Sequence, residues 1–105
     1  MHQLVQVPVQ VTFRHMEPSE AVRGRVLDLM QRLQRFHGRI TRCQVVVEAP
    51  AKHQRHGSPF VVKIDAQIPG DALHVHSERL ARETHADVYV ALSDAFDTLK
   101  RKLCQ

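Results

Sequence analysis

Residues 5–36 read VQVPVQVTFRHMEPSEAVRGRVLDLMQRLQRF, and the spacing of their apolar side chains changes once along the way. Through residue 14 almost every second residue is apolar, which is the period of a β-strand with one buried face. Pro8 cannot donate to a ladder, so it indicates a sheet edge or a late strand start. From residue 20 the apolar positions recur every three or four residues, which predicts an amphipathic helix.

The predicted helix has identifiable ends. Ser19 is placed to accept a hydrogen bond from the first free amides, and Glu20 puts a negative charge in the first turn. Gly38 is expected to end the helix, as glycine often does just beyond a C-terminus. The apolar stripe comprises Val22, Val26, Leu29, Met30, Leu33 and Phe36.

Three more strands are predicted downstream, from alternating apolar residues at 43–47, 60–68 and 73–76. A basic hairpin loop, 50–59, separates the first two of them, and the turn Pro69-Gly70-Asp71 separates the last two. The connection from the last strand to the final helix is expected over 77–86.

The chain closes with a second predicted helix, residues 87–103. Its apolar stripe comprises Val88, Leu92, Ala95, Phe96, Leu99 and Leu103. The order is β-α-β-β-β-α, and each helix has one apolar stripe. We therefore expect an α+β two-layer sandwich with both helices packed on one face of a four-stranded sheet. One core should bury Val9, Val11, Leu33, Val45, Val47, Val62, Ile64 and Leu99.

Composition excludes several classes of protein. A length of 105 residues suits one domain, 1–105, and 30 of them are Leu, Ile, Val or Phe, enough for a folded core. The longest apolar run, 88–92, is too short to span a membrane, and the N-terminus has no signal-peptide pattern. Cys43 and Cys104 form no CxxC pair, which agrees with a reducing compartment. We expect a soluble, cytoplasmic protein.

The net charge of +4 is unevenly distributed. Residues 19–56 carry eight basic and three acidic groups, whereas residues 63–97 carry three basic and seven acidic groups. Lys100, Arg101 and Lys102 follow at the end of the chain. Segregated charge of this kind fits a protein that presents a basic face to a polyanion, although solvated helix faces would also account for it.

The basic residues of the first helix are ordered on its surface. At roughly 100° per residue, Arg25, Arg32 and Arg35 fall within about 80° of one another. If the two helices lie side by side and parallel, the end of this helix, with Arg32, Arg35 and Arg39, approaches the basic end of the second helix: Lys100, Arg101 and Lys102. Such a cluster could hold phosphates, or it could merely complement the negative ends of two helices. Both interpretations remain open at this stage.

Metal binding and catalysis have weaker support. His53 and His56 lie in the basic loop, and His74 and His76 share one face of a strand, but no further ligand has matching spacing. No nucleophile motif or glycine-rich signature occurs, and Cys43 points inward. We expect no catalytic residue, metal, cofactor or small-molecule substrate.

Two segments resemble the ribosome hibernation-promoting factor family, also called ribosome-associated inhibitor, ribosomal subunit interface protein or sigma-54 modulation protein. The first is helix 1 with its exit, Ser19-Glu20-Ala21-Val22-Arg23 through Leu33-x-x-Phe36-x-x-Arg39-Ile40. The more specific match is Asp87-x-Tyr89-x-Ala91-Leu92 followed by Asp97-x-Leu99-x-Arg101-x-Leu103. Ser93 replaces the usual Asp, and Thr98 stands where relatives often carry lysine. The resemblance covers nearly the whole chain and implies the same element order.

The resemblance implies a non-enzymatic bacterial ribosome ligand. It would bind the small subunit and its ribosomal RNA in the channel used by messenger and transfer RNA, and block initiation during stress or stationary phase. Asp87 and Tyr89 match the family signature. With the helical positions above, the expected RNA-binding residues are Arg23, Arg25, Arg32, Arg35, Arg39, Lys100, Arg101 and Lys102. Two alternatives remain: a stand-alone structured-RNA-binding module, and a small regulatory protein that binds metal through its histidines.

Overall fold

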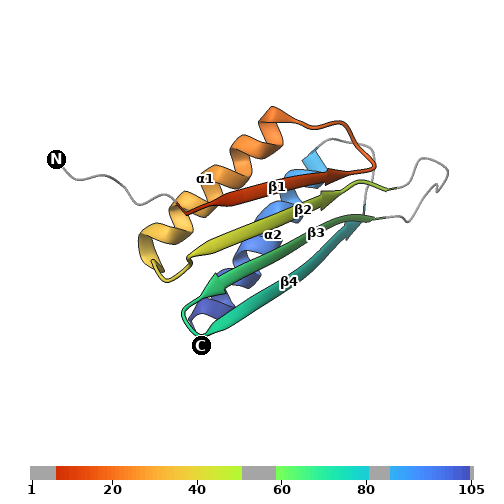
Figure 1. Cartoon of the computed structure of the whole chain (residues 1–105). Coiled ribbons are helices and arrows are strands. Elements are labelled where there is room, and N and C mark those ends of the chain that lie inside the picture. The colour runs from red at the N-terminus through yellow and green to blue at the C-terminus, as the bar shows by residue number, and fades with distance from the viewer. Residues whose placement is uncertain (1–6, 51–58, 81–85, 105) are drawn as a thin grey trace.

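The computed structural model describes residues 7–50, 59–80 and 86–104, which form two layers (Figure 1). One layer is a four-stranded sheet in the order β1-β2-β3-β4, and both helices cover the same face of it. This confirms the predicted α+β arrangement. The elements are β1 (Val9–Arg14), α1 (Glu20–Phe36), β2 (Arg42–Glu48), β3 (Pro59–Ile68), β4 (Asp71–Leu80) and α2 (Ala86–Leu103).

The sheet is mixed. β1 and β2 are parallel, and α1 supplies the crossover that parallel neighbours need. The pairs β2–β3 and β3–β4 are antiparallel hairpins. Val11, Val45, Ile64 and Val75 stand opposite one another in register, so they form one apolar row across all four strands. Gly70 has a φ of 80°, a conformation that glycine tolerates, and it allows the two-residue turn after Ile68.

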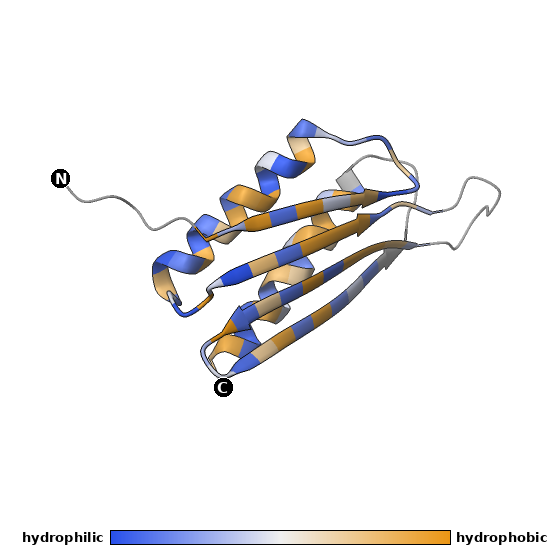
Figure 2. Cartoon of the chain, viewed as in Figure 1, coloured by the Kyte–Doolittle hydropathy of each residue, from blue (hydrophilic) through white to orange (hydrophobic). Residues whose placement is uncertain are grey.

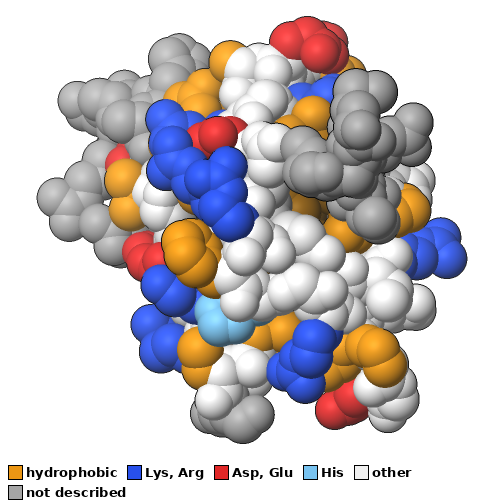
Figure 3. Space-filling model, turned by 90° about the vertical axis from the view of Figure 1, so that its left-hand side faces the viewer, with side chains coloured by type: hydrophobic (Ala, Val, Ile, Leu, Met, Phe, Trp, Pro, Cys, Tyr) orange, Lys and Arg blue, Asp and Glu red, His pale blue; other side chains and the backbone are white. Residues whose placement is uncertain are grey.

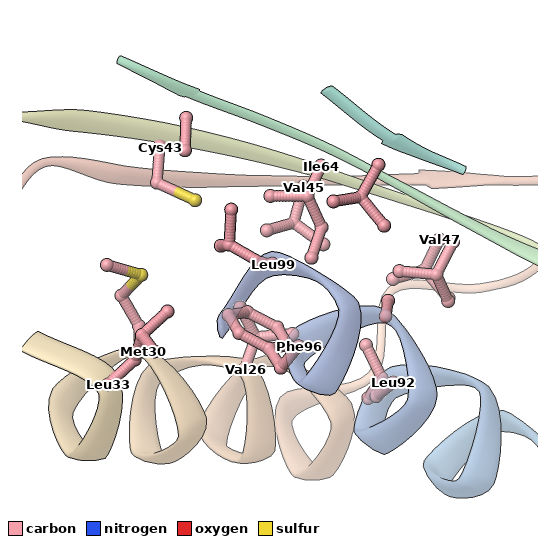
Figure 4. Packing of buried hydrophobic residues seen from close by; sticks show 14 of the residues in the cluster. Val26, Met30, Leu33, Cys43, Val45, Val47, Ile64, Leu92, Phe96 and Leu99 are labelled. Atoms are coloured by element: carbon pink, nitrogen blue, oxygen red, sulfur yellow. The ribbon is translucent and has the colours of Figure 1, made fainter. Parts of the chain in front are cut away.

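The core lies between the layers, where the inward residues of the strands meet the helix stripes (Figure 4). Alternating colours along the strands in Figure 2 follow from this one-sided burial. Six of the eight predicted core residues are buried: Leu33, Val45, Val47, Val62, Ile64 and Leu99. Val9 and Val11 are only half-buried, because α1 packs only lightly against the edge strand β1, whereas α2 packs closely against the other edge strand, β4.

The first helix begins at the predicted cap and ends just before Gly38, as predicted. The Val22 amide donates to Ser19 Oγ at 3.2 Å, so Ser19 is the N-cap. At the other end the helix stops at Phe36, and the amide of the C-cap residue His37 donates to the Leu33 carbonyl at 2.8 Å. Gly38 does not end the helix through a positive φ, since Gly70 is the only glycine with one in the described residues.

Two expectations about the ends of elements are wrong. Phe36 does not belong to the buried stripe: its side chain is 75% exposed, because it lies about 80° round the helix from Val26. β4 does not stop at residue 76 but continues to Leu80, so the connection to α2 is shorter than predicted. The inward position after Val75 is Ser77, which pairs opposite Val62. Because serine is small and polar, it interrupts the apolar alternation from which the strand was predicted. Among the described helices, none is both long and apolar enough to cross a membrane.

Candidate nucleic-acid interface

The two helices run parallel and end on the same side of the molecule (Figure 1). α1 returns the chain from β1 to a parallel β2, and α2 follows β4, which also runs parallel to β2. Two side-chain contacts join the helix ends. The Arg39 guanidinium donates from Nη2 to the Leu103 carbonyl at 3.0 Å, and His37 Nε2 lies 3.8 Å from Cys104 Sγ.

Six predicted binding residues lie at or near these helix ends, and we call them the helix-end cluster: Arg32, Arg35, Arg39, Lys100, Arg101 and Lys102. All six are exposed. Figure 3 looks onto this end of the molecule, and blue Lys and Arg side chains lie around it, most of them on the left. The last free carbonyls of a helix are electronegative, so part of this positive charge complements both helix ends.

Arg39 has more than one possible use. Its bond to the Leu103 carbonyl satisfies one of the free acceptors at the end of α2. A guanidinium carries five N–H donors in a planar fork, so one such bond leaves donors for a second group. Arg39 can therefore fix α2 against the α1–β2 connection and still hold a phosphate.

In the described part of the chain, Arg32 and Arg101 contact residues of their own helices. Arg32 Nη2 lies 3.1 Å from the Asp28 carboxylate, one turn earlier, and its side chain is 67% exposed. Exposed pairs of this kind contribute about 0–1 kcal/mol, so a phosphate could displace the carboxylate. Arg101 donates to Thr98 Oγ1 at 3.1 Å, and that hydroxyl donates to the Asp94 carbonyl at 3.0 Å.

The three basic residues at the end of α2 point in different directions. At about 100° per residue they spread over roughly 200° of the helix surface. Lys100 lies one turn before Cys104, which contacts His37, so Lys100 is on the side that faces α1. Arg101 and Lys102 extend the positive charge away from that side. The sequence-based expectation that all three form one compact patch with α1 therefore holds best for Lys100.

Arg23 and Arg25 lie apart from the helix-end cluster, near the start of α1. Ten residues separate Arg25 from Arg35, which is about 15 Å along a helix. The Arg25 guanidinium lies over the Tyr89 ring of α2, 5.4 Å from its centroid. Arg23 lies on the other flank, 5.4 Å from the centroid of the Phe13 ring of β1 and 3.4 Å from the Glu20 carboxylate. The eight predicted residues thus do not form a single surface.

The model of the family described as sigma 54 modulation protein / S30EA ribosomal protein matches residues 9–105, nearly the whole chain. The chain belongs to this family. The resemblance seen in the sequence is confirmed, and the S30EA match includes all eight predicted basic residues.

Relatives in two bacteria carry related names. The chain is 28% identical over 95 residues to a ribosome hibernation promoting factor of Pseudomonas putida, covering 90% of this chain and 81% of that protein. It is 30% identical over 96 residues to a ribosome hibernation promotion factor of Deinococcus radiodurans, covering 90% of this chain. This second relative is longer, and the chain spans 46% of it.

Two solved structures share the fold. A ribosomal subunit interface protein from Coxiella burnetii superposes with a TM-score of 0.74 at 16% identity, covering 93% of this chain and 94% of that one. The N-terminal domain of Protein Y from Thermus thermophilus gives 0.68 at 22% identity, with 94% and 96% covered. At these identities the likeness concerns the fold alone.

The signature residues of this S30EA chain lie at the start of α2. Tyr89 is half-buried between the helices, packs against the core and carries Arg25 on its ring. A cation over a tyrosine ring contributes about 0.5–1 kcal/mol at an exposed site. Asp87 lies in the first turn, where its charge complements the helix dipole. These positions give both residues a structural role.

The remaining candidates fall outside the helix ends. Cys43 is buried, and burial followed by the charge of Asp65 raises the pKa of its thiol to about 12, so it packs as a thiol. His74 pairs with Asp65, and His76 Nε2 lies 2.8 Å from Glu78. His53 and His56 lie outside the described residues. Within residues 7–50, 59–80 and 86–104, no three potential metal ligands come together.

One exposed side chain at the helix ends was not among the predicted site residues. Phe36 is the last residue of α1, and its side chain is exposed although its spacing predicts a place in the apolar stripe. A helical-wheel count would have placed it at the margin of the stripe, between the core side and the side that carries Arg25 and Arg32. This position beside arginines is the sequence feature that could have identified Phe36 as a surface residue of the site.

Proposed function

We propose that the protein binds the small ribosomal subunit in the channel used by messenger and transfer RNA, and blocks initiation under stress or in stationary phase. The names of its relatives, which are hibernation and subunit interface proteins, support association with ribosomes. The family match over residues 9–105 supports a role for this one domain.

The observation that carries the proposal is the meeting of the two helix ends. Arg39 bridges them through the Leu103 carbonyl, and exposed cations of both helices lie at the same end of the molecule. Arginine and lysine hold phosphates, and most contacts of nucleic-acid-binding proteins go to phosphate and sugar. We assign phosphate binding to the helix-end cluster. Arg23 and Arg25, which are engaged by aromatic rings, would contribute at its margin.

The proposed mechanism is occupation rather than catalysis. A protein held in the channel by several phosphate contacts excludes messenger and transfer RNA sterically, so it needs no cofactor, metal or small-molecule substrate. It would act in the cytoplasm, where ribosomes initiate. The chain would lower initiation in proportion to the fraction of small subunits that it occupies.

Sedimentation with purified small subunits tests the proposal directly. The protein should sediment with the subunits, and prebound messenger and initiator transfer RNA should reduce the bound fraction, because the channel is then occupied. Excess duplex RNA should compete poorly. If duplex RNA binds the protein as tightly as the subunits do and releases it from them, the stand-alone RNA-binding alternative is favoured instead. Binding that channel ligands leave unchanged would place the protein elsewhere on the ribosome.

A further inference from the structure

Phe36 is the most exposed large apolar side chain in the described part of the chain. It is 75% exposed, and Leu27, at 46%, is the other one of this kind. Single exposed apolar residues are common on protein surfaces and need no explanation by themselves. What distinguishes Phe36 is the chemistry of its neighbours.

Cationic side chains border the ring. Arg32 lies one turn earlier on the same side of α1, about 40° away, and Arg35 is the preceding residue. Three residues later Arg39 reaches across to the end of α2, and His37 contacts Cys104 there. The ring therefore lies within the helix-end cluster, where the two helices meet.

We propose that Phe36 is a stacking platform for an unpaired base of RNA. This inference rests on the proposed function and deepens it, because it names a contact to a base beside the contacts to phosphate. Single-stranded RNA is commonly bound by cations that follow the backbone and by aromatic rings that stack on its bases. An exposed ring among arginines provides both groups at one place.

Charge favours RNA over other occupants of this surface. An apolar surface of a protein partner would be expected to continue into further apolar residues, but the sequence around Phe36 is RLQRFHGR. A second copy of the chain, docked ring to ring, would bring two helix-end clusters of the same sign together, which is repulsive. In single-stranded RNA, the phosphates complement the positive charge, and an exposed base can stack on the ring.

Leu27 provides a matched control on the same helix. Nine residues separate it from Phe36, so the two side chains lie on opposite sides of α1. Both are exposed and apolar, and replacing either by alanine should leave the core intact. They differ because Phe36 places an aromatic ring beside the helix-end cluster and Leu27 does not.

Binding to purified small subunits should be compared for the wild type, Phe36→Ala, Phe36→Leu, Phe36→Tyr and Leu27→Ala. Stacking on one base accounts for about a five- to 150-fold change in affinity, so Phe36→Ala should lose that much. Phe36→Leu should lose nearly as much, because it keeps the apolar surface without the ring. Phe36→Tyr and Leu27→Ala should bind like the wild type.

Fluorescence gives a readout of stacking itself. The chain contains no tryptophan, so Phe36→Trp introduces a single indole at the proposed platform. At low salt, a single-stranded oligoadenylate should quench its emission, whereas an abasic oligomer of equal length and charge should not. Equal quenching by both oligomers, or none by either, would overturn the proposal.

The outcomes separate this inference from the proposed function. If the wild type does not bind small subunits at all, the proposed function fails. If the wild type binds and Phe36→Ala binds equally well, the stacking proposal is wrong and the proposed function is unaffected. Retained affinity in Phe36→Leu would point to an apolar contact with a ribosomal protein, and loss of a dimer in Phe36→Ala would point to a second copy. Either result overturns the proposal.

Discussion

The outer face of the sheet and the helix ends are both polar surfaces, but they carry charge differently. On the outer face, the acidic side chains have polar neighbours within the sheet: Asp65 lies against His74, and Glu78 against His76. Gln44 also donates to Gln10 there, at 3.4 Å. At the helix ends six cations gather, and Arg32 is the one with a carboxylate partner in the described residues.

This difference shows why total charge alone is a weak guide to function. Mixed charges on one face largely cancel at a distance, whereas clustered charges of one sign add and attract a polyanion. The net charge of +4 is modest, but the structure concentrates positive charge where two helix ends already need it. The two surfaces should therefore depend on one core and differ in binding.

The largest effect is expected in the core that supports both surfaces. Leu99 is fully buried between α2 and the sheet, so Leu99→Ala should lower the free energy of unfolding by about 2–5 kcal/mol through the cavity that it leaves. Urea unfolding of this variant and of Leu27→Ala provides the comparison, since an exposed site should change stability by less than about 0.5 kcal/mol. Similar losses in both variants would contradict the two-layer core.

A second effect on stability should appear at alkaline pH. Burial, followed by the charge of Asp65, raises the pKa of the Cys43 thiol from 9.0 to about 12. The folded protein therefore binds this proton more tightly than the unfolded chain does. The resulting contribution to stability is complete below about pH 9 and is lost as the pH rises to about 12.

Unfolding should be measured between pH 8 and pH 11 for the wild type, Cys43→Ala and Cys104→Ala. The difference between the wild type and Cys43→Ala should shrink by up to a few kcal/mol over this range, at about 1.4 kcal/mol per unit of pKa shift. Cys104 is exposed, so Cys104→Ala should keep the slope of the wild type. An unchanged difference for Cys43→Ala would show that its thiol titrates normally.

Most of the fold could be predicted because periodicity reports which side of an element is buried. The stripe from Val88 to Leu103 and the alternation around Val45 are correct for that reason. Periodicity does not report how far a neighbouring element extends. Val11 on the edge strand has the right spacing but is only half-buried, and Phe36 lies at the margin of the stripe, at the end of its helix, where nothing covers it in the described residues.

The candidate site was predictable only in part. Parallel helices follow from the element order, so the approach of Arg39 to the end of α2 could be expected, and the structure confirms it. The neighbours of each arginine on α1 depend on the position and rotation of the helix on the sheet. Arg23 therefore contacts Phe13 while Arg25 contacts Tyr89, a division that the sequence pattern did not show.

A smaller effect is expected at the bridge between the helix ends. Arg39→Ala removes the donor to the Leu103 carbonyl, which should lower stability by about 0.5–1.5 kcal/mol and also weaken binding to small subunits. Arg42→Ala, an exposed change at the start of β2, is the control and should do neither. If Arg39→Ala lowers stability and leaves subunit binding unchanged, Arg39 serves only the helix end.

The smallest effect on stability is expected for Arg101→Ala, but this variant compares the two surfaces most directly. Arg101 is exposed, and its bond to Thr98 lies within one helix, so stability should stay within about 0.5 kcal/mol of the wild type. Lys63 is also exposed, on the outer face of the sheet opposite His76. Each replacement removes one positive charge, so the net charge of the two variants is the same.

Binding of both variants to small subunits should be measured at several salt concentrations. A phosphate contact releases condensed counterions, so Arg101→Ala should bind more weakly, with a salt slope shallower by roughly one unit. Lys63→Ala should keep the affinity and slope of the wild type, because its surface does not face the RNA. Equal losses would mean that only net charge matters, and the helix-end cluster would then not be the binding site. A change confined to Arg101→Ala would assign the phosphate contacts to the end where both helices stop.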